Sequence, residues 1–359
     1  MFRFIAVRAR LAVAVAALVA VFTLLASGAG AATLVAYNVY PLVSDSGGST
    51  APLTDTSLVN GWGLSATATS PWWVSNNKTN TSTLYSGVGS KTALTVAVPG
   101  GPTGTVANPT TTDFAISQNG VSGASRFLFD TASGQILGWA PTVNGTAAVV
   151  AVDASSSHAV FYGLAVANDR LYAADFHNAK VDAYDASFNP LSLGFADPGI
   201  PKGWAPFGIQ ALNGNIFVTY AKQDAKATIA VPGGGQGYVD EFTPDGKLVG
   251  RVASAGKSTA PLNAPWGLAM APSNFGAYSG DLLVGNFGDG KISAYLQQAN
   301  GKWGYKGQIR SANGTPIVLD GLWAIAFGNG ASAGPTNNLY FAAGPSAQSH
   351  GLFGFIGVG

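Results

Sequence analysis

The sequence has 359 residues, a formal net charge of +1, and charged side chains at 10% of its positions. A chain this close to neutral offers no basic surface to attract nucleic acid or an anionic membrane. It contains no cysteine, which excludes disulfides, a thiol nucleophile and cysteine metal sites.

The N-terminus has the pattern of a secretory signal peptide. Three arginines in the first ten residues precede an apolar run of about 15 residues, Leu11–Leu25, and an A-x-A cleavage site at Ala29–Ala31. The run is shorter than the roughly 20 residues that span a bilayer, although a retained N-terminal anchor is the alternative. We assign residues 1–32 to the signal and 33–359 to one secreted or periplasmic domain without a further membrane span.

The composition of the mature chain is typical of an all-β protein. Glycine occurs 48 times, and Glu241 is the only glutamate of the sequence. No stretch after the signal has apolar residues at the helical spacing i, i+3, i+4, i+7. Frequent Gly, Asn, Ser and Thr between short apolar runs indicate strands joined by tight turns.

A unit of strands repeats along the chain. It begins with a glycine-containing strand of small and apolar residues, at 61–64, 102–106, 161–166, 205–209, 264–269 and 320–326. A more hydrophobic second strand follows at 72–76, 126–129, 171–175, 216–220, 282–286 and 339–343. Third strands are expected at 83–85, 135–139, 180–184, 237–242, 291–295 and 352–356, and fourth strands at 94–98, 147–151 and 247–249.

Six units of four antiparallel strands predict a six-bladed β-propeller. The sequence ends on a third strand, whereas residues 34–40 near the N-terminus form a spare strand. We expect this strand to complete the last blade, which would close the ring and remove both exposed edges. A seven-bladed ring, with an extra unit hidden in residues 105–125, is the alternative.

The alternating direction of the strands predicts one functional face. Residues just before each inner strand and just after each second strand converge there, as polar groups around a small-ligand site do. The ligand-binding candidates are Asn60, Trp62, Trp266 and Asp320 from the entries, and Asn76, Asp175, His177, Lys222, Asp224, Asn286 and Asp289 from the exits. Each has a simpler interpretation: Asn and Asp are default turn residues, the tryptophans pack between blades, and a loop histidine is solvated.

Two kinds of chemistry are open for this face. A central Ca²⁺ held by oxygens of different blades would use Asn76, Asp175, Asn286 and Asp320, although Glu241 sits on an outer strand and cannot join them. The only match to a catalytic motif, G-x-S-x-G at 330–334, lies in a loop with no helix after it, so a nucleophile elbow cannot form.

Several segments of the sequence resemble those of a known family. They include Leu58–Leu64, Asp175–Val181, Trp204–Ile209, Leu282–Gly290 and Asp320–Gly330. Together they are similar to an uncharacterised family of exported bacterial proteins, some of which carry a C-terminal PEP-CTERM sorting signal. The resemblance implies an NHL-like or lactonase-like propeller with no established activity. No Pro-Glu-Pro tail follows Ile356, so free secretion or periplasmic residence is expected.

The sequence therefore predicts an exported, monomeric propeller that binds a small ligand, a carbohydrate or a protein partner on the face described above. Whether it is an enzyme is open, and the absence of a catalytic constellation favours binding over catalysis. A Ca²⁺-dependent hydrolase of the lactonase or phosphotriesterase kind is one alternative. A structural protein of the envelope or matrix is the other.

Overall fold

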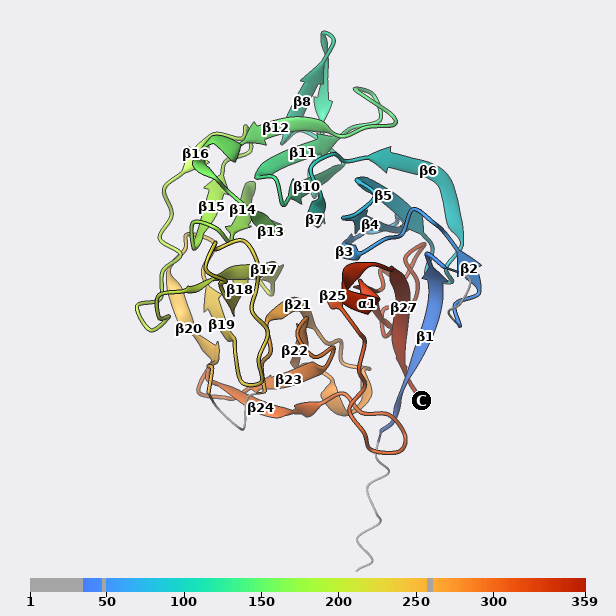
Figure 1. Ribbon diagram of the computed structural model, residues 1–359, viewed down its shortest axis with the longest axis vertical. Coiled ribbons are helices and arrows are strands. Elements are labelled where there is room, and N and C mark those ends of the chain that lie inside the picture. Colours follow the sequence, from blue (N-terminus) through green and yellow to red (C-terminus); the bar gives the residue numbers. More distant parts are fainter. Residues whose placement is uncertain (1–34, 47–49, 257–260) are drawn as a thin grey trace, which may run out of the picture. The chain divides into compact units, whose positions relative to one another are not determined.

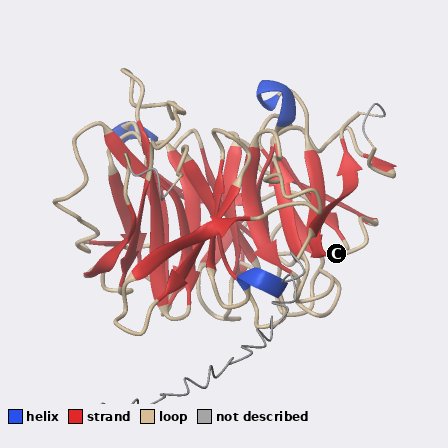
Figure 2. Ribbon diagram, turned by 90° about the horizontal axis from the view of Figure 1, so that it is seen from below, coloured by secondary structure: helices blue, strands red, loops and turns tan. Residues whose placement is uncertain are grey.

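A computed structural model describes residues 35–46, 50–256 and 261–359. In the unit from Val35 to Gly359, six sheets are arranged around a common centre, which confirms the six-bladed β-propeller (Figure 1). Each sheet contains four antiparallel strands that follow one another from the centre outward. Figure 2 shows the strands of neighbouring sheets side by side, with the loops gathered at the two ends of the strands.

We number the blades I to VI by their inner strands in chain order. The inner strands are β3 (Gly61–Ser65), β7 (Pro102–Ala107), β13 (Phe161–Ala167), β17 (Trp204–Leu212), β21 (Pro265–Met270) and β25 (Leu322–Phe327). The second strands are β4 (Trp72–Asn76), β10 (Phe127–Thr131), β14 (Arg170–Asp175), β18 (Asn215–Lys222), β22 (Leu282–Asn286) and β26 (Leu339–Ala343). The third strands are β5 (Thr81–Tyr85), β11 (Gln135–Trp139), β15 (Lys180–Tyr184), β19 (Tyr238–Phe242), β23 (Ile292–Gln297) and β27 (Leu352–Val358).

The fourth strands are the most variable part of each blade. They are β6 (Lys91–Ala97), β12 (Val149–Asp153), β16 (Pro190–Leu191), β20 (Leu248–Ala253), β24 (Trp303–Gln308) and, in blade VI, β1 (Tyr37–Ser44). The sequence did not predict β16 or β24, because outer strands face solvent and need no regular apolar pattern. By contrast, every residue of β4, β10, β22 and β26 is buried, because neighbouring blades cover both faces of these second strands.

The N-terminal strand closes the ring. β1 pairs antiparallel with β27, from Tyr37 opposite Val358 to Ser44 opposite Leu352, and a short parallel strand β2 (Leu53–Thr54) follows it. The predicted closure is therefore confirmed, although the strand runs over 37–44 rather than 34–40. The Tyr37 hydroxyl donates a hydrogen bond to the Phe275 carbonyl of blade V at 2.8 Å, which ties the closing strand to a second blade.

The long insertion of blade II does not contain an extra blade. Its strands form the hairpin β8 (Ala115–Gln118) and β9 (Val121–Ala124), which pairs with no other sheet among the described residues. The seven-bladed alternative is therefore wrong. Helical structure in the described chain is confined to the single turns η1 (Ser155–Ser157), η2 (Gly276–Tyr278) and α1 (Pro345–Gln348).

The predicted signal peptide, residues 1–32, lies outside the described residues. In the described part of the chain, no helix has the length and apolar character needed to cross a membrane.

A buried carboxyl group lies near the inner strands of blades II and III. Asp130 in β10 is fully buried, and its Oδ1 accepts hydrogen bonds from the Thr103 hydroxyl at 2.8 Å and the Gly104 amide at 2.5 Å. Burial raises the pKa of Asp130 from 3.8 to about 7, against the lowering effect of these hydrogen bonds. A carboxyl with a higher pKa in the folded than in the unfolded state stabilises the fold at low pH, and this contribution is lost as the pH rises through about 7.

We therefore expect Asp130→Asn to flatten the pH dependence of stability. Between about pH 5 and about pH 8, the wild-type free energy of unfolding should fall by about 2–3 kcal/mol more than that of the variant. Urea unfolding at a series of pH values measures the difference, because all other titrating groups are shared by the two proteins. Parallel pH profiles would show that Asp130 is ionised in the folded protein throughout this range.

Candidate functional site

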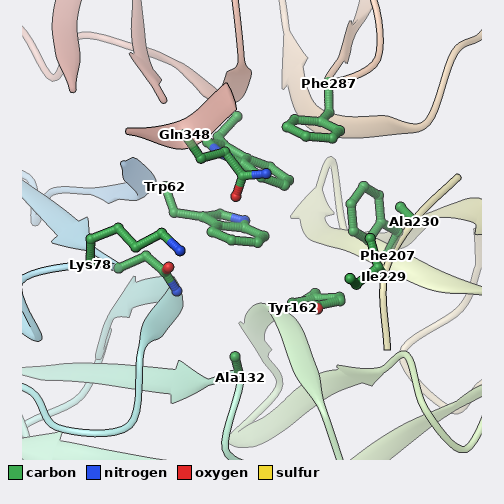
Figure 3. Close-up of a pocket in the computed structure, with 11 residues that line it drawn as sticks. Trp62, Lys78, Ala132, Tyr162, Phe207, Ile229, Ala230, Phe287 and Gln348 are labelled. Atoms are coloured by element: carbon green, nitrogen blue, oxygen red, sulfur yellow. The ribbon is translucent and has the colours of Figure 1, made fainter. Parts of the chain in front are cut away.

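One pocket of the propeller is built by all six blades. It has a volume of about 270 Å³ and lies where inner strands begin and second strands end (Figure 3). We call it the axial pocket. Its lining residues are Trp62, Asn77, Lys78, Ala132, Tyr162, Phe207, Ile229, Ala230, Phe287, Trp323 and Gln348. These segments converge on the face that the sequence predicted, whereas ligand binding there stays a prediction.

A β-bulge recurs in the inner strands and turns an aromatic side chain toward the centre of the ring. In blades I, III, IV, V and VI, the pairing of inner and second strands shifts register around one aromatic residue: Trp62, Tyr162, Phe207, Trp266 and Trp323. A β-bulge turns a side chain away from the regular alternation of the strand. Blade II carries Thr103 at this position instead, bonded to the buried Asp130.

Three of these rings and Phe287, which follows β22, form a continuous stack, which we call the aromatic stack. The centroids of Trp62 and Trp323 are 3.5 Å apart with an interplanar angle of 16°. Phe287 continues the stack beyond Trp323 at 4.1 Å and 17°, and Tyr162 continues it beyond Trp62 at 5.3 Å and 19°. Trp266 meets both tryptophans edge-on and donates from its indole nitrogen to the Tyr162 carbonyl at 2.7 Å. These rings form the floor of the pocket. Because each ring packs against other rings, the floor is already in place before a ligand binds.

An asparagine fixes the polar groups beside the stack. Asn60 is fully buried and has φ 53°, a left-handed conformation that asparagine tolerates better than most residues. Its Oδ1 accepts a hydrogen bond from the Trp323 indole at 2.9 Å. Its Nδ2 donates to Asn77 Oδ1 at 3.2 Å and to Gln348 Oε1 at 3.1 Å. Asn60 therefore joins the stack to two polar lining residues from blades I and VI.

The donors that the pocket offers to a ligand include the Trp62 indole and the Lys78 ammonium group. The Trp62 indole projects toward the middle of the pocket, and its buried Nε1–H has no hydrogen-bond partner among the described residues (Figure 3). Lys78 is exposed, extends toward Trp62, and takes part in none of the ion pairs of the described chain. A buried N–H without a partner costs about 1–3 kcal/mol, so a ligand that accepts from Trp62 gains this energy on binding.

A tyrosine holds one wall of the pocket in place. The Tyr162 hydroxyl donates to the carbonyl of Thr228, next to the lining residues Ile229 and Ala230. Burial raises the pKa of Tyr162 to about 12, so the hydroxyl keeps its proton at neutral pH and remains a donor. Asp224 Oδ1 folds the same loop by accepting from the amides of Thr228 and Ile229 at 2.7 and 3.0 Å.

The structure brings few of the predicted site residues together. Trp62 lines the axial pocket, while Asn60 and Trp266 support it from behind. The remaining candidates do not line it; they are Asn76, Asp175, His177, Lys222, Asp224, Asn286, Asp289 and Asp320. Most of these make the local hydrogen bonds of turns, as the simpler interpretation suggested; for example, Asp289 accepts from the Lys291 amide and pairs with its ammonium group at 3.3 Å.

His177 lies at a neighbouring hollow of about 510 Å³. This hollow is lined by Ser133, His158 and Thr228 among others, and it shares Ala132 with the axial pocket. The rings of His158 and His177 are 6.1 Å apart, and the buried Nδ1 of His177 has no partner among the described residues. Lys222 is exposed and lines neither hollow.

The donor set of the axial pocket does not fit Ca²⁺. This ion takes six to eight oxygen ligands, mainly carboxylates and carbonyls, whereas the lining consists of aromatic and aliphatic carbon, two amides and an ammonium group. Among the four predicted ligands, Asp175, Asn286 and Asp320 accept hydrogen bonds from nearby backbone amides, and only Asn76 Oδ1 is buried without a partner. The described residues contain no group of three or more acidic or histidine side chains placed to hold a metal ion. Calcium binding stays a prediction that no arrangement in the described chain supports.

Several lining residues were not among the ligand-binding candidates chosen from the sequence, namely Lys78, Tyr162, Phe207, Phe287, Trp323 and Gln348. A signal for three of them exists in the sequence. Tyr162 and Phe207 each precede a glycine of an inner strand, as Trp62 and Trp266 do, and Trp323 occupies the same place before Ala324. An aromatic residue repeated at one position of successive blades must converge near the centre of the ring. No comparable pattern marks Lys78 or Gln348.

Comparisons with known proteins place the chain among uncharacterised relatives. No family model matches it. The uncharacterised protein R648 of Acanthamoeba polyphaga mimivirus is 33% identical over 319 residues, which cover 84% of this chain and 76% of R648. The uncharacterised protein L690 of the same virus is 31% identical over 318 residues, covering 84% and 81% of the two chains. These relatives are viral, so the resemblance to an exported bacterial family stays a prediction.

Solved structures share the architecture at low identity. A streptogramin B lyase has a TM-score of 0.52 at 12% identity, covering 90% of this chain and 97% of the lyase. A protein of unknown function from Bacteroides thetaiotaomicron has a TM-score of 0.57 at 12% identity, covering 89% and 76%. A glucose dehydrogenase has a TM-score of 0.52 at 13% identity, covering 88% and 98%. At these identities the likeness concerns the fold alone.

Proposed function

The chain belongs to the family of the uncharacterised mimivirus proteins R648 and L690, and we propose that it is a propeller that binds a small, largely apolar organic molecule in the axial pocket. Export forms part of the proposal, because residues 1–32 have the pattern of a secretory signal peptide. The protein would then meet its ligand outside the cell, as a monomer.

One observation carries the proposal: aromatic rings at equivalent bulges of four blades, together with loops of the others, enclose one preformed pocket. Binding sites for small molecules are concave, mainly apolar, and contain a few convergent polar groups. A cavity of about 150 Å³ holds benzene, so the axial pocket, with about 270 Å³, has room for one ring with substituents. Carbohydrate binding is supported less well, because the stacking partners already cover the ring faces that a sugar would use.

The proposal is tested with a neutral aromatic probe. We expect benzyl alcohol to quench or shift the tryptophan fluorescence of the purified protein in a saturable manner, because Trp62 and Trp323 line the pocket. Ala132→Phe should abolish the response, since this residue sits at the edge of the pocket and a phenyl group would fill it. A crystal soaked with benzyl alcohol would locate the probe.

The matched control is Ala277→Phe in η2, an exposed position in the loop between the inner and second strands of blade V, at the other end of these strands. It adds the same side chain and should leave binding unchanged. The same titration with methyl glucoside tests the carbohydrate alternative. Binding that survives Ala132→Phe, or a probe located elsewhere in the crystal, would contradict the proposal.

A further inference from the structure

We propose that the ligand of the axial pocket carries a single carboxylate, which Lys78 and the Trp62 indole bind. The apolar body of the ligand packs against the wall formed by Phe207, Ile229 and Ala230. This inference rests on the proposed function and adds the chemical class of the ligand. Three independent features of the pocket carry it: its hydrogen-bonding groups, its charge, and the orientation of its rings.

Each side-chain amide oxygen of the pocket already accepts one hydrogen bond. Asn77 Oδ1 and Gln348 Oε1 both accept hydrogen bonds from Asn60 Nδ2, at 3.2 and 3.1 Å. The Tyr162 hydroxyl donates to the Thr228 carbonyl and is held by it. The Trp62 Nε1–H is a donor only, buried and without a partner among the described residues. A ligand group that accepts hydrogen bonds therefore fits the pocket better than one that donates them.

The charge of the pocket has one sign. Lys78 is the only ionisable lining residue with a charge at neutral pH, and no aspartate or glutamate belongs to the lining. Its ammonium group is not neutralised by an ion pair of the described chain, and it extends toward Trp62 in Figure 3. One cation beside an apolar wall attracts an anion more strongly than it would in open water. A single positive charge also matches a monoanion better than a phosphate dianion.

The two tryptophans of the aromatic stack have both faces covered by other rings. Trp62 and Trp323 cover one face of each other at 3.5 Å, and Tyr162 and Phe287 lie against the outer faces. The edge of an aromatic ring carries positive partial charge, whereas its face is negative. The ring edges that this stacking leaves uncovered attract the oxygens of a carboxylate. Phe207, Ile229 and Ala230 provide the apolar wall for the rest of the ligand.

Calorimetric titration with benzoate, benzamide and benzyl alcohol tests the inference, because the three probes share one ring and only benzoate carries a charge. At low salt we expect benzoate to bind roughly ten-fold more tightly than benzamide, a difference of about 1.4 kcal/mol. Lys78→Met keeps a side chain of similar length without its charge, so it should remove the preference for benzoate over benzamide. Added salt should reduce the preference in the wild type, because Lys78 is exposed.

Lys302→Met is the matched control, since Lys302 is an exposed lysine in the turn before β24 and is not part of the pocket. It should retain the full preference for benzoate. A crystal soaked with benzoate should place the carboxylate within hydrogen-bond distance of Trp62 Nε1 and Lys78 Nζ.

Equal binding of benzoate and benzamide, or a carboxylate directed away from Lys78, would overturn the carboxylate assignment while leaving the pocket as a binding site. Failure of all three probes to bind, in the wild type as in Ala132→Phe, would overturn the proposed function itself. The two failures are therefore distinguishable.

Discussion

Trp323→Ala should destabilise the propeller by about 4–5 kcal/mol, the upper part of the range for removing a buried tryptophan. Trp323 is 2% exposed and stacks between Trp62 and Phe287. It also meets Phe207 and Trp266 edge-on. Its indole N–H bonds the buried Asn60 Oδ1, which would lose that partner. The substitution therefore leaves both a cavity and an unsatisfied acceptor at the centre of the ring.

Urea unfolding monitored by circular dichroism measures this loss. Trp204→Ala is the matched control, because Trp204 begins an inner strand but is only partly buried and packs edge-on against Tyr238. We expect it to cost about 1–2 kcal/mol, in proportion to the smaller apolar area it buries. Similar losses for the two variants would mean that the stack contributes no more than an ordinary tryptophan at the rim.

Gly208→Ala should destabilise the protein by about 3 kcal/mol or more, although it adds only one methyl group. A Cβ atom at Gly208 in β17 would lie far inside van der Waals contact of the Trp266 carbonyl in β21, and 3.0 Å from Thr219 Oγ1. The backbone cannot yield easily, because the Gly208 amide donates to the same Thr219 hydroxyl at 2.8 Å. The inner strands of blades IV and V would have to separate, and with them the rings that they carry.

Gly250→Ala in β20 is the matched control within the same blade. A Cβ atom at Gly250 would meet no heavy atom within 4 Å, and the residue does not have positive φ. This variant should be neutral or more stable by about 0.4–1 kcal/mol, because alanine restricts the unfolded chain. Thermal unfolding of the two variants side by side would decide the matter: an unchanged midpoint for Gly208→Ala would show that neighbouring inner strands can move apart.

The repeat pattern predicted the fold in some detail. Six inner strands, five of which contain a glycine, their hydrophobic second strands and the closing strand β1 all lie within a few residues of the predicted ranges. These features are readable because burial on both faces, and the crowding of backbone near the centre, restrict the residue types that each strand accepts. The outer strands β16 and β24 were not predicted, because their exposed faces do not restrict the residue types that they accept.

The candidate site was predicted as a location but not as a set of residues. Polar residues at strand ends were chosen because polar groups mark binding sites. Asp175 and Asp224, however, make the hydrogen bonds of their own turns, and Asp320 accepts from the Ser346 amide in the α1 turn. The sequence cannot distinguish a turn aspartate from a ligand-binding one, because both follow a strand. The pocket is made instead by aromatic residues whose side chains leave the strand pattern at a bulge.

By itself the sequence determined the number of blades, the closure of the ring and the face on which its loops converge, because these follow from local alternation and repetition. Only the tertiary structure decided which side chains meet there. The register shifts at Trp62, Tyr162, Phe207 and Trp323 turn four rings toward one another. Asn60 uses the acceptors of Asn77 and Gln348, so the pocket retains donors, an ammonium group and apolar walls. Contacts between residues more than two hundred positions apart in the chain, such as Trp62 with Trp323, form only when all six blades close around one centre.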